Sequence, residues 1–273
     1  MTTRIDDVPR RAGRPPVARL FRLPALPWWL RIGSVVAVLA VWQLTAPLVN
    51  PLFLRPPSAV VASLLDLVRD GTLPTAVVES GHNLVIGFAI ALVVGLTVGI
   101  ATARWRALGS LADPWVAALY SLPSVALVPF LSLWLGVGDT PKVAAIALFA
   151  VFPILVNTQQ GVRLVDPQLL EVARSFCTGE RQLWSHVLIP GALPMIFAGV
   201  RLAIPRALVG MIVAEFLTSV GHGLGSLIIT YQNVFRVDRM LVPVLVVALM
   251  GVVLMGAVQW MERRLLPWAR RDR

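Results

Sequence analysis

The dominant pattern along the chain is a series of long apolar segments that are nearly free of charge. About 20 apolar residues in a helix are needed to cross the roughly 30 Å hydrocarbon core of a bilayer. Six segments reach or approach that length, and five of them contain no Asp, Glu, Lys or Arg. We therefore predict an all-α membrane protein with six transmembrane helices, at about residues 32–49, 84–103, 114–138, 143–162, 192–217 and 240–261.

A shorter amphipathic segment separates the first two predicted spans. Pro56, Pro57 and Ser58 are followed by apolar residues at helical spacing and then by Gly71. We predict a helix with Ser58 as its N-cap, too short to span the bilayer and lying flat at the outer surface. A cover packed over the bundle is the favoured role for this helix, and a substrate site is the alternative.

The third and fourth predicted spans contain prolines in their interiors. Pro123 and Pro129 fall in the third span, and Pro153 falls in the fourth. A proline inside a helix frees a backbone carbonyl and bends the helix, so neighbouring helices or a cavity have to accommodate the bend. The prolines therefore fit either a translocation pathway or ordinary packing.

Composition and charge placement set the topology. The chain is 57% hydrophobic and only 14% charged, whereas a soluble domain is about one quarter charged. With the N-terminus inside, 17 basic residues lie in the cytoplasmic segments and five lie outside, as the positive-inside rule requires. We predict cytoplasmic termini, a basic tail at residues 1–29 and one transmembrane domain at residues 30–273. This topology accounts for the net charge of +10, so no nucleic-acid partner is expected.

The loop at residues 164–194 is longer than a connector between two spans needs to be. Asp166 and Pro167 predict a helix start, with the Asp as N-cap and the Pro at the first helical position. Apolar residues then recur at steps of three and four and predict one apolar face, made of Leu169, Leu170, Ala173, Phe176 and Cys177.

A second short helix is predicted in the same loop. Thr178 and Gly179 break the first helix, and Thr178 is expected to cap a helix that begins at Glu180. Pro190 and Pro194 then return the chain to the membrane. Two short helices with a bend between them are therefore expected to stand in the cytoplasm.

This loop resembles the signature of the permeases of binding-protein-dependent ABC importers, which reads Glu-Ala-Ala, three residues, Gly, nine residues, Ile, any residue, Leu-Pro. Glu171, Ala173 and Pro190 match it, with Val172, Val187 and Ile189 in place of Ala, Ile and Leu. Cys177 stands where the family has glycine, and Gly179 is expected to supply the flexibility instead. Further segments resemble the sulfonate, taurine and nitrate branch: Leu133–Lys142, Phe152–Asn157, Gly199–Ala203, Val213–Glu215 and Gly223–Gly225.

The resemblance implies a type I importer fold and a set of partners. The first loop helix would dock into a cleft of a separate ABC ATPase, which uses ATP and Mg²⁺. The chain itself has no Gly-Lys-Ser/Thr phosphate loop, because its one lysine, Lys142, lies in Pro-Lys-Val. The expected assembly consists of two permease copies in a bacterial inner membrane, two ATPase subunits and an external substrate-binding protein. The residues assigned to the ATPase-coupling loop are Asp166, Pro167, Leu170, Glu171, Ala173, Cys177, Gly179, Ile189 and Pro190.

Three charged residues lie inside the fifth span, where an isolated charge is costly and faces a partner or a wet cavity. Arg201 and Glu215 are 14 residues apart, about 40° from each other around the helix and about 21 Å along it, whereas Arg206 points the opposite way from Glu215. All three are candidate pathway residues. Arg201 is expected either to stabilise packing near the inner boundary or to meet an anionic substrate.

The resemblance also implies a cargo, and the residues weigh against other functional classes. The expected cargo is a small anion such as an alkanesulfonate, taurine or nitrate. The alternative is that the same machinery imports a thiamine precursor or another small organic molecule. An ion-coupled carrier would need intramembrane carboxylates, of which Glu215 is the one convincing example. One cysteine and three histidines without ligand spacing predict no metal site, and no catalytic residue or bound cofactor is expected.

Overall fold

The structure is a computed structural model that describes residues 28–218 and 222–267. All regular structure in these two ranges is helical. The predicted basic tail lies outside the described residues except for Trp28 and Trp29, which begin the first helix. In chain order the elements are α1 (Trp28–Thr45), η2 (Ala46–Leu48), α2 (Pro57–Arg69), α3 (Thr72–Arg104), α4 (Arg106–Ser121), η3 (Ser124–Leu127), α5 (Val128–Leu135), α6 (Asp139–Arg163), α7 (Pro167–Ser175), α8 (Glu180–Leu183), η4 (Trp184–Leu188), α9 (Ile189–Thr218), α10 (Leu224–Asn233) and α11 (Val237–Leu265).

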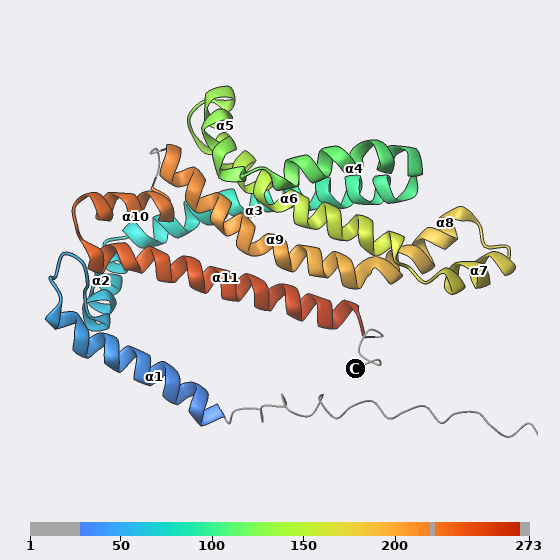
Figure 1. Ribbon diagram of the computed structural model, residues 1–273. Helices are drawn as coiled ribbons and strands as arrows, with labels where there is room; N and C mark the ends of the chain where they lie inside the picture. The colour runs from blue at the N-terminus through green and yellow to red at the C-terminus, as the bar shows by residue number, and fades with distance from the viewer. Residues whose placement is uncertain (1–27, 219–221, 268–273) are drawn as a thin grey trace, which may run out of the picture.

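Long helices run side by side through the molecule (Figure 1). Helices α7 and α8 project at one end, which we call the loop end, and α2 and α10 lie at the opposite end, which we call the far end. Five segments of the described chain are long and apolar enough to cross a membrane: Trp28–Leu48, Thr72–Arg104, Asp139–Arg163, Glu180–Thr218 and Val237–Leu265. The pair α4 and η3–α5 is a sixth if it is counted as one broken span.

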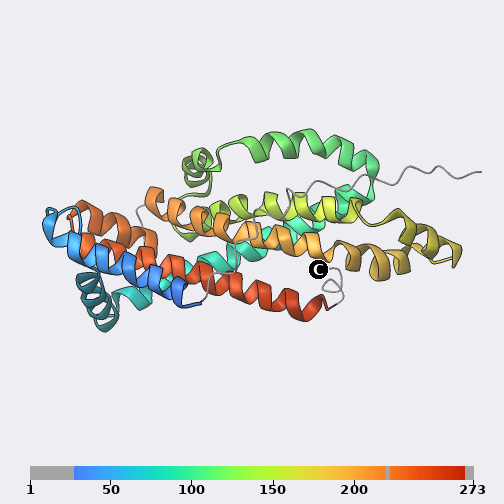
Figure 2. The ribbon, with the colours of Figure 1, turned by 60° about the horizontal axis from the view of Figure 1, so that its bottom comes forward.

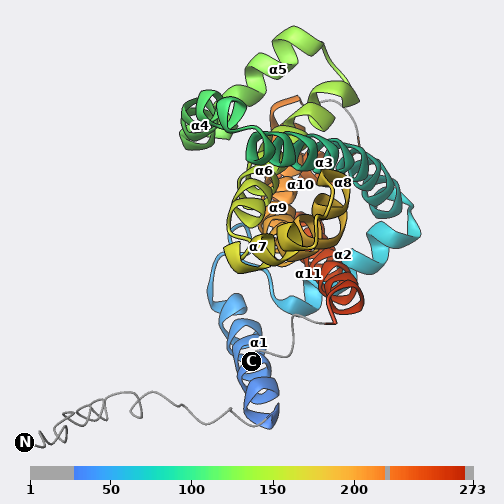
Figure 3. The ribbon, with the colours of Figure 1, turned by 90° about the vertical axis from the view of Figure 1, so that its right-hand side faces the viewer.

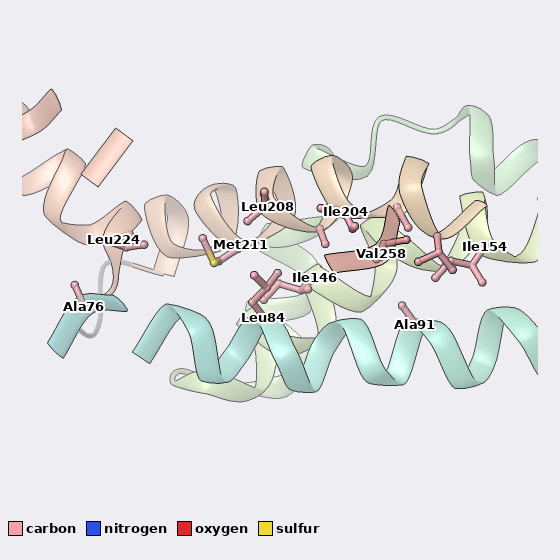
Figure 4. Close-up of a cluster of buried hydrophobic side chains, with 14 of the residues drawn as sticks. Ala76, Leu84, Ala91, Ile146, Ile154, Ile204, Leu208, Met211, Leu224 and Val258 are labelled. Atoms are coloured by element: carbon pink, nitrogen blue, oxygen red, sulfur yellow. The ribbon is translucent and has the colours of Figure 1, made fainter. Parts of the chain in front are cut away.

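The core consists of α3, α6 and α9, with α6 in the middle. Figure 4 shows apolar side chains of these helices meeting side chains of α10 and α11. The buried residues labelled there are Ala76, Leu84, Ala91, Ile146, Ile154, Ile204, Leu208, Met211, Leu224 and Val258. By contrast, only 6% of the apolar window of α1 is buried, against 56% for α6, so α1 lies outside this core, as Figure 3 also shows.

Glycines let α3 and α6 pack backbone to side chain. A Cβ atom at Gly87 would lie 2.7 Å from Cβ of Ile146, and one at Gly95 would lie 2.8 Å from Cβ of Ile154. Gly99, one turn further along, belongs to the same row. Lipid provides no hydrophobic drive for helices to associate, so close contact of this kind supplies much of the attraction between them.

The predicted third span, residues 114–138, is wrong as a continuous helix. The chain leaves the helical conformation at Leu122 and Pro123, and α5 continues at 90° to α4. The residue before a proline is pushed out of the helical region, and Leu122 accordingly has φ −69° and ψ 139°. Figure 2 shows the turn between α4, which runs beside the bundle, and α5. Pro129 falls in the first turn of α5, where a proline is tolerated, while Pro153 remains inside α6.

The cap predicted for the short helix α2 is also wrong. The N-cap is Pro56, and Ser58 instead exchanges hydrogen bonds with Gln43 of α1, at 3.1 and 3.2 Å. One face of α2 is buried against the bundle, and Ser63 on that face donates to a carboxylate oxygen of Asp238 at 2.8 Å. The helix therefore packs as a cover over the far end. Its other face exposes Val61, Leu65 and Val68.

The glycine row generates a prediction about stability. Gly95→Ala should destabilise the protein by roughly 1–3 kcal/mol, because the added methyl group overpacks the α3–α6 contact. Gly256→Ala in α11 is the matched control, since a Cβ there meets nothing within 4 Å and alanine favours the helix. The thermal unfolding midpoint of each variant in detergent is the measurement. Equal midpoints for the two variants would contradict the packing assigned to Gly95.

Candidate functional site

The first loop helix is capped by its own sequence. A carboxylate oxygen of Asp166 accepts the backbone N–H of Gln168 at 2.9 Å, and Pro167 occupies the first helical position of α7. The helix also carries a polar side, on which Glu171 and Arg174 are exposed. The residue at which α7 begins is therefore determined by the Asp166 cap and by Pro167.

The apolar residues of α7 do not form the single face predicted for them. Ala173 is buried and Leu170 is partly buried, and both belong to a small core under the loop that also holds Val165, Leu183, Leu188 and Ala192. Leu169, Val172 and Phe176 instead point outward, with exposed fractions of 54%, 55% and 80%. The loop thus presents apolar side chains to its surroundings, as expected of a surface that binds another protein.

The bend between the loop helices lies at Cys177. This residue has a φ of 54°, in the left-handed region, and the N–H groups of Cys177 and Thr178 bond to the carbonyls of Arg174 and Ala173 at 2.9 and 3.2 Å. Together these features form a Schellman motif, in which the left-handed position is usually glycine. The expectation that Gly179 supplies the flexibility is wrong, because Gly179 has φ −66° and ψ 154°, a conformation open to any residue.

The second loop helix is held in a different way from that predicted. Its N-cap is Gly179, and no side chain caps it, so the assignment of Thr178 as the cap is wrong. Glu180 instead forms an ion pair with Arg104, the last residue of α3, at 3.0 Å, and the Arg104 guanidinium lies 5.2 Å from the ring centroid of Trp184.

A π-helical turn, Trp184–Leu188, joins α8 to α9. Pro190 follows in the first turn of α9. Ile189 is 37% exposed and begins α9. The chain consequently runs as one helical rod from Glu180 to Thr218, without a break at Pro190 or Pro194.

The charged residues of α9 contact three different parts of the molecule. Arg201 forms an ion pair with Glu262 of α11. Arg206, on the exposed side of α9, donates a hydrogen bond of 3.1 Å to the Tyr120 hydroxyl of α4. Glu215 is only 1% exposed and faces α3 and α10.

Glu215 is enclosed in a cage of hydrogen-bond donors. Its carboxylate accepts the Ser80 hydroxyl and the Gly225 backbone N–H, each at 2.6 Å. A Cβ at Gly223 would lie 2.5 Å from the carboxylate, so only glycine lets the backbone come this close. The N-terminus of α10, where the partial positive charge of a helix lies, therefore sits against the buried acid.

Sequence reasoning missed a second ion cluster beside this cage. Lys142 is 2% exposed, and its ammonium group contacts Glu79 at 3.0 Å and Asp139 at 3.2 Å, while Asn83 donates to Asp139 at 3.0 Å. Glu79 also accepts the backbone N–H of His222 at 2.9 Å. The signal was present in the sequence, since Glu79 and Asn83 precede the predicted span by less than two turns, but neither is among the candidate residues predicted above.

The described residues contain no group of three or more His, Cys, Asp or Glu side chains that is placed to hold a metal ion. The charged residues within the bundle are engaged with one another, with hydroxyl groups or with backbone amides. The geometry is that of a helical membrane bundle with an exposed loop at one end.

Comparison with known proteins identifies the family. Residues 85–267 match the family described as binding-protein-dependent transport system inner membrane component. The putative aliphatic sulfonates transport permease protein SsuC of Escherichia coli K12 is 34% identical over 250 residues, covering 90% of this chain and 92% of that protein. The taurine transport system permease protein TauC of the same organism is 28% identical over 246 residues, covering 88% and 89%.

Solved structures agree on the fold. A chain of the methionine ABC transporter MetNI, in an inward-facing conformation, superimposes with a TM-score of 0.57 at 18% identity, covering 71% of this chain and 96% of that one. At that identity the likeness concerns the fold alone. On the family match and the relative at 34% identity, the chain belongs to the binding-protein-dependent transport system inner membrane components, the permease subunits of ABC importers.

Proposed function

We propose that this chain forms the translocation pathway of an ATP-driven importer for a small organic anion, with an alkanesulfonate as the leading candidate. Its membership of the permease family carries the proposal, and the names of the two relatives supply the substrate class. An external binding protein would deliver the anion, and a pair of separate ATPase subunits would hydrolyse ATP with Mg²⁺. A second copy of this chain would complete the pathway.

The same proposal sets the orientation. The loop end would face the cytoplasm of a bacterium, with both termini on that side, and the far end would face outward. The distribution of basic residues along the sequence supports this orientation. The loop end also offers what an ATPase needs to bind, namely exposed apolar side chains next to charged ones, and it leads directly into α9.

Reconstituted transport tests this function. The chain, its ATPase and its binding protein in liposomes should accumulate a labelled alkanesulfonate only when ATP and Mg²⁺ are present on the ATPase side. An ATPase variant that binds ATP without hydrolysing it should abolish uptake. Uptake that continues without any ATPase would support the ion-coupled carrier and overturn the proposal.

Charge reversal on α7 tests the coupling surface. Glu171→Lys should release the ATPase or separate ATP hydrolysis from uptake, because an exposed carboxylate on the docking helix would meet its partner with the wrong sign. Co-purification of the ATPase and the ratio of ATP hydrolysed to anion imported are the measurements. Asp66→Lys, an exposed reversal on α2 at the far end, is the control for ATPase binding and should leave co-purification unchanged. Normal coupling in Glu171→Lys would remove α7 from the docking surface.

The Schellman bend predicts the effect of restoring the family glycine. Cys177→Gly should stabilise the loop by about 1 kcal/mol, since a side chain in the left-handed region carries a penalty of about that size. Amide hydrogen exchange at Thr178, whose N–H bonds to Ala173, should slow by about fivefold. Gly179→Ala is the matched control and should be tolerated, because its backbone already suits alanine. Faster exchange in Cys177→Gly, or disruption by Gly179→Ala, would place the bend at Gly179.

A further inference from the structure

The core helices α6 and α9 carry three basic residues apart from Arg163, which ends α6. They are Lys142, Arg201 and Arg206. Two of them meet carboxylates. Lys142 contacts Glu79 and Asp139, and Arg201 contacts Glu262. Within the described part of the chain, Arg206 is therefore the member of this set whose positive charge no carboxylate opposes.

The partner of Arg206 is a neutral tyrosine. The guanidinium donates one hydrogen bond of 3.1 Å to the Tyr120 hydroxyl and lies 4.9 Å from the centroid of the Tyr120 ring. That ring is itself packed against Phe152 of α6, with centroids 6.2 Å apart. These contacts orient the guanidinium, but they leave its charge uncancelled and most of its five N–H donors available.

Arg206 also borders a hollow. A groove of about 370 Å³ lies where α4 breaks before α5, and Arg206 lines it together with Leu122, Pro123, Ser124, Phe149, Pro205 and Val209. That volume falls in the range of small-molecule sites, and the mainly apolar lining with a few polar groups is typical of them. The broken helix and Pro205 thus create a space at the exposed side of α9.

The position of Arg206 along the bundle favours an occupant within the membrane over a lipid headgroup at its boundary. Arg206 is about 7.5 Å along α9 from Arg201, which pairs near the loop end of α11, and about 13.5 Å short of Glu215 near the far end. Arg206 therefore lies well inside the apolar length of the bundle. A charge at such a depth faces the bundle interior or a water-filled route.

We propose that Arg206 is the anion-binding residue of the translocation pathway, and that it takes the sulfonate or a similar oxyanion group of the transported molecule. This inference rests on the proposed function. The planar guanidinium presents paired donors that suit two oxygens of one oxyanion. Tyr120 holds it in place, and the apolar wall of Leu122, Phe149 and Val209 accommodates the organic part. Arg201, for which the sequence left packing and substrate contact as alternatives, is neutralised by Glu262 and acts in packing.

A single engineered thiol tests the site without knowledge of the natural substrate. In a Cys177→Gly background, which removes the one native cysteine, Ser124→Cys places a thiol on the groove. The complete complex in liposomes is treated with 2-sulfonatoethyl methanethiosulfonate, itself an alkanesulfonate, or with its trimethylammonium counterpart. Relative to a free thiol, the sulfonate reagent should be favoured on the order of 10-fold, because a cation lies within the groove. Adding Arg206→Gln should abolish the preference.

Transport measurements then separate the assignment of Arg206 from the proposed importer function. Arg206→Gln should lower uptake of the anion by at least about 10-fold while assembly and basal ATP hydrolysis stay normal, and Arg206→Lys should restore part of the uptake. Arg201→Gln is the matched control in the same helix, and it should reduce assembly or thermal stability by leaving Glu262 unpaired.

Two results would overturn the assignment of Arg206. One is a reagent preference that is the same with and without Arg206→Gln, as expected if a carboxylate of the second permease copy neutralises the guanidinium. The other is normal anion uptake by Arg206→Gln. In either case ATP-dependent uptake by the unaltered complex would still support the importer, whereas its absence would refute the importer itself.

Discussion

The described structure depends on the neutralisation of charges buried at its far end. Glu215 is held by Ser80 of α3 and by the start of α10, and Lys142 of α6 is held by Glu79 of α3 and by Asp139. An ion left without its partner in such surroundings typically costs about 3–5 kcal/mol, so removing any one partner should be strongly destabilising. They tie four helices to one another at one level. These contacts therefore help to set how the core helices are aligned along one another.

Glycine packing and the polar clusters have complementary effects. The glycine row of α3 brings two apolar helices together, but apolar surfaces alone select one register poorly. The hydrogen bonds and ion pairs at the far end are directional, and only one register satisfies them. Gly223 and Gly225 combine both effects, because the absence of a side chain lets backbone approach the Glu215 carboxylate.

The sequence predicts those features whose cause is local. Long charge-free segments predict the long helices, and Asp166 followed by Pro167 predicts the start of α7. The features it does not reveal depend on partners that are distant in sequence. Glu79 and Lys142 are 63 positions apart, and Arg201 meets Glu262 from 61 positions away. Local reasoning also fails where tertiary structure imposes a conformation, as at Cys177, which adopts a glycine-like φ despite its side chain.

Two surfaces left open by internal contacts, one at the loop end and one midway along α9, fit the roles proposed above in docking and in anion binding. The loop end exposes Phe176, and in the middle of α9 the Arg206 guanidinium meets a tyrosine hydroxyl and, among the described residues, no carboxylate. One continuous rod, Glu180–Thr218, joins these regions. Because α9 packs along α6 and is tied to α11 through Arg201 and Glu262, a displacement imposed on the loop would be passed to the helices around Arg206 as well as to α9 itself. A helical segment that runs from the loop past Arg206 is a physical means by which a docked ATPase could alter the affinity of the proposed anion site.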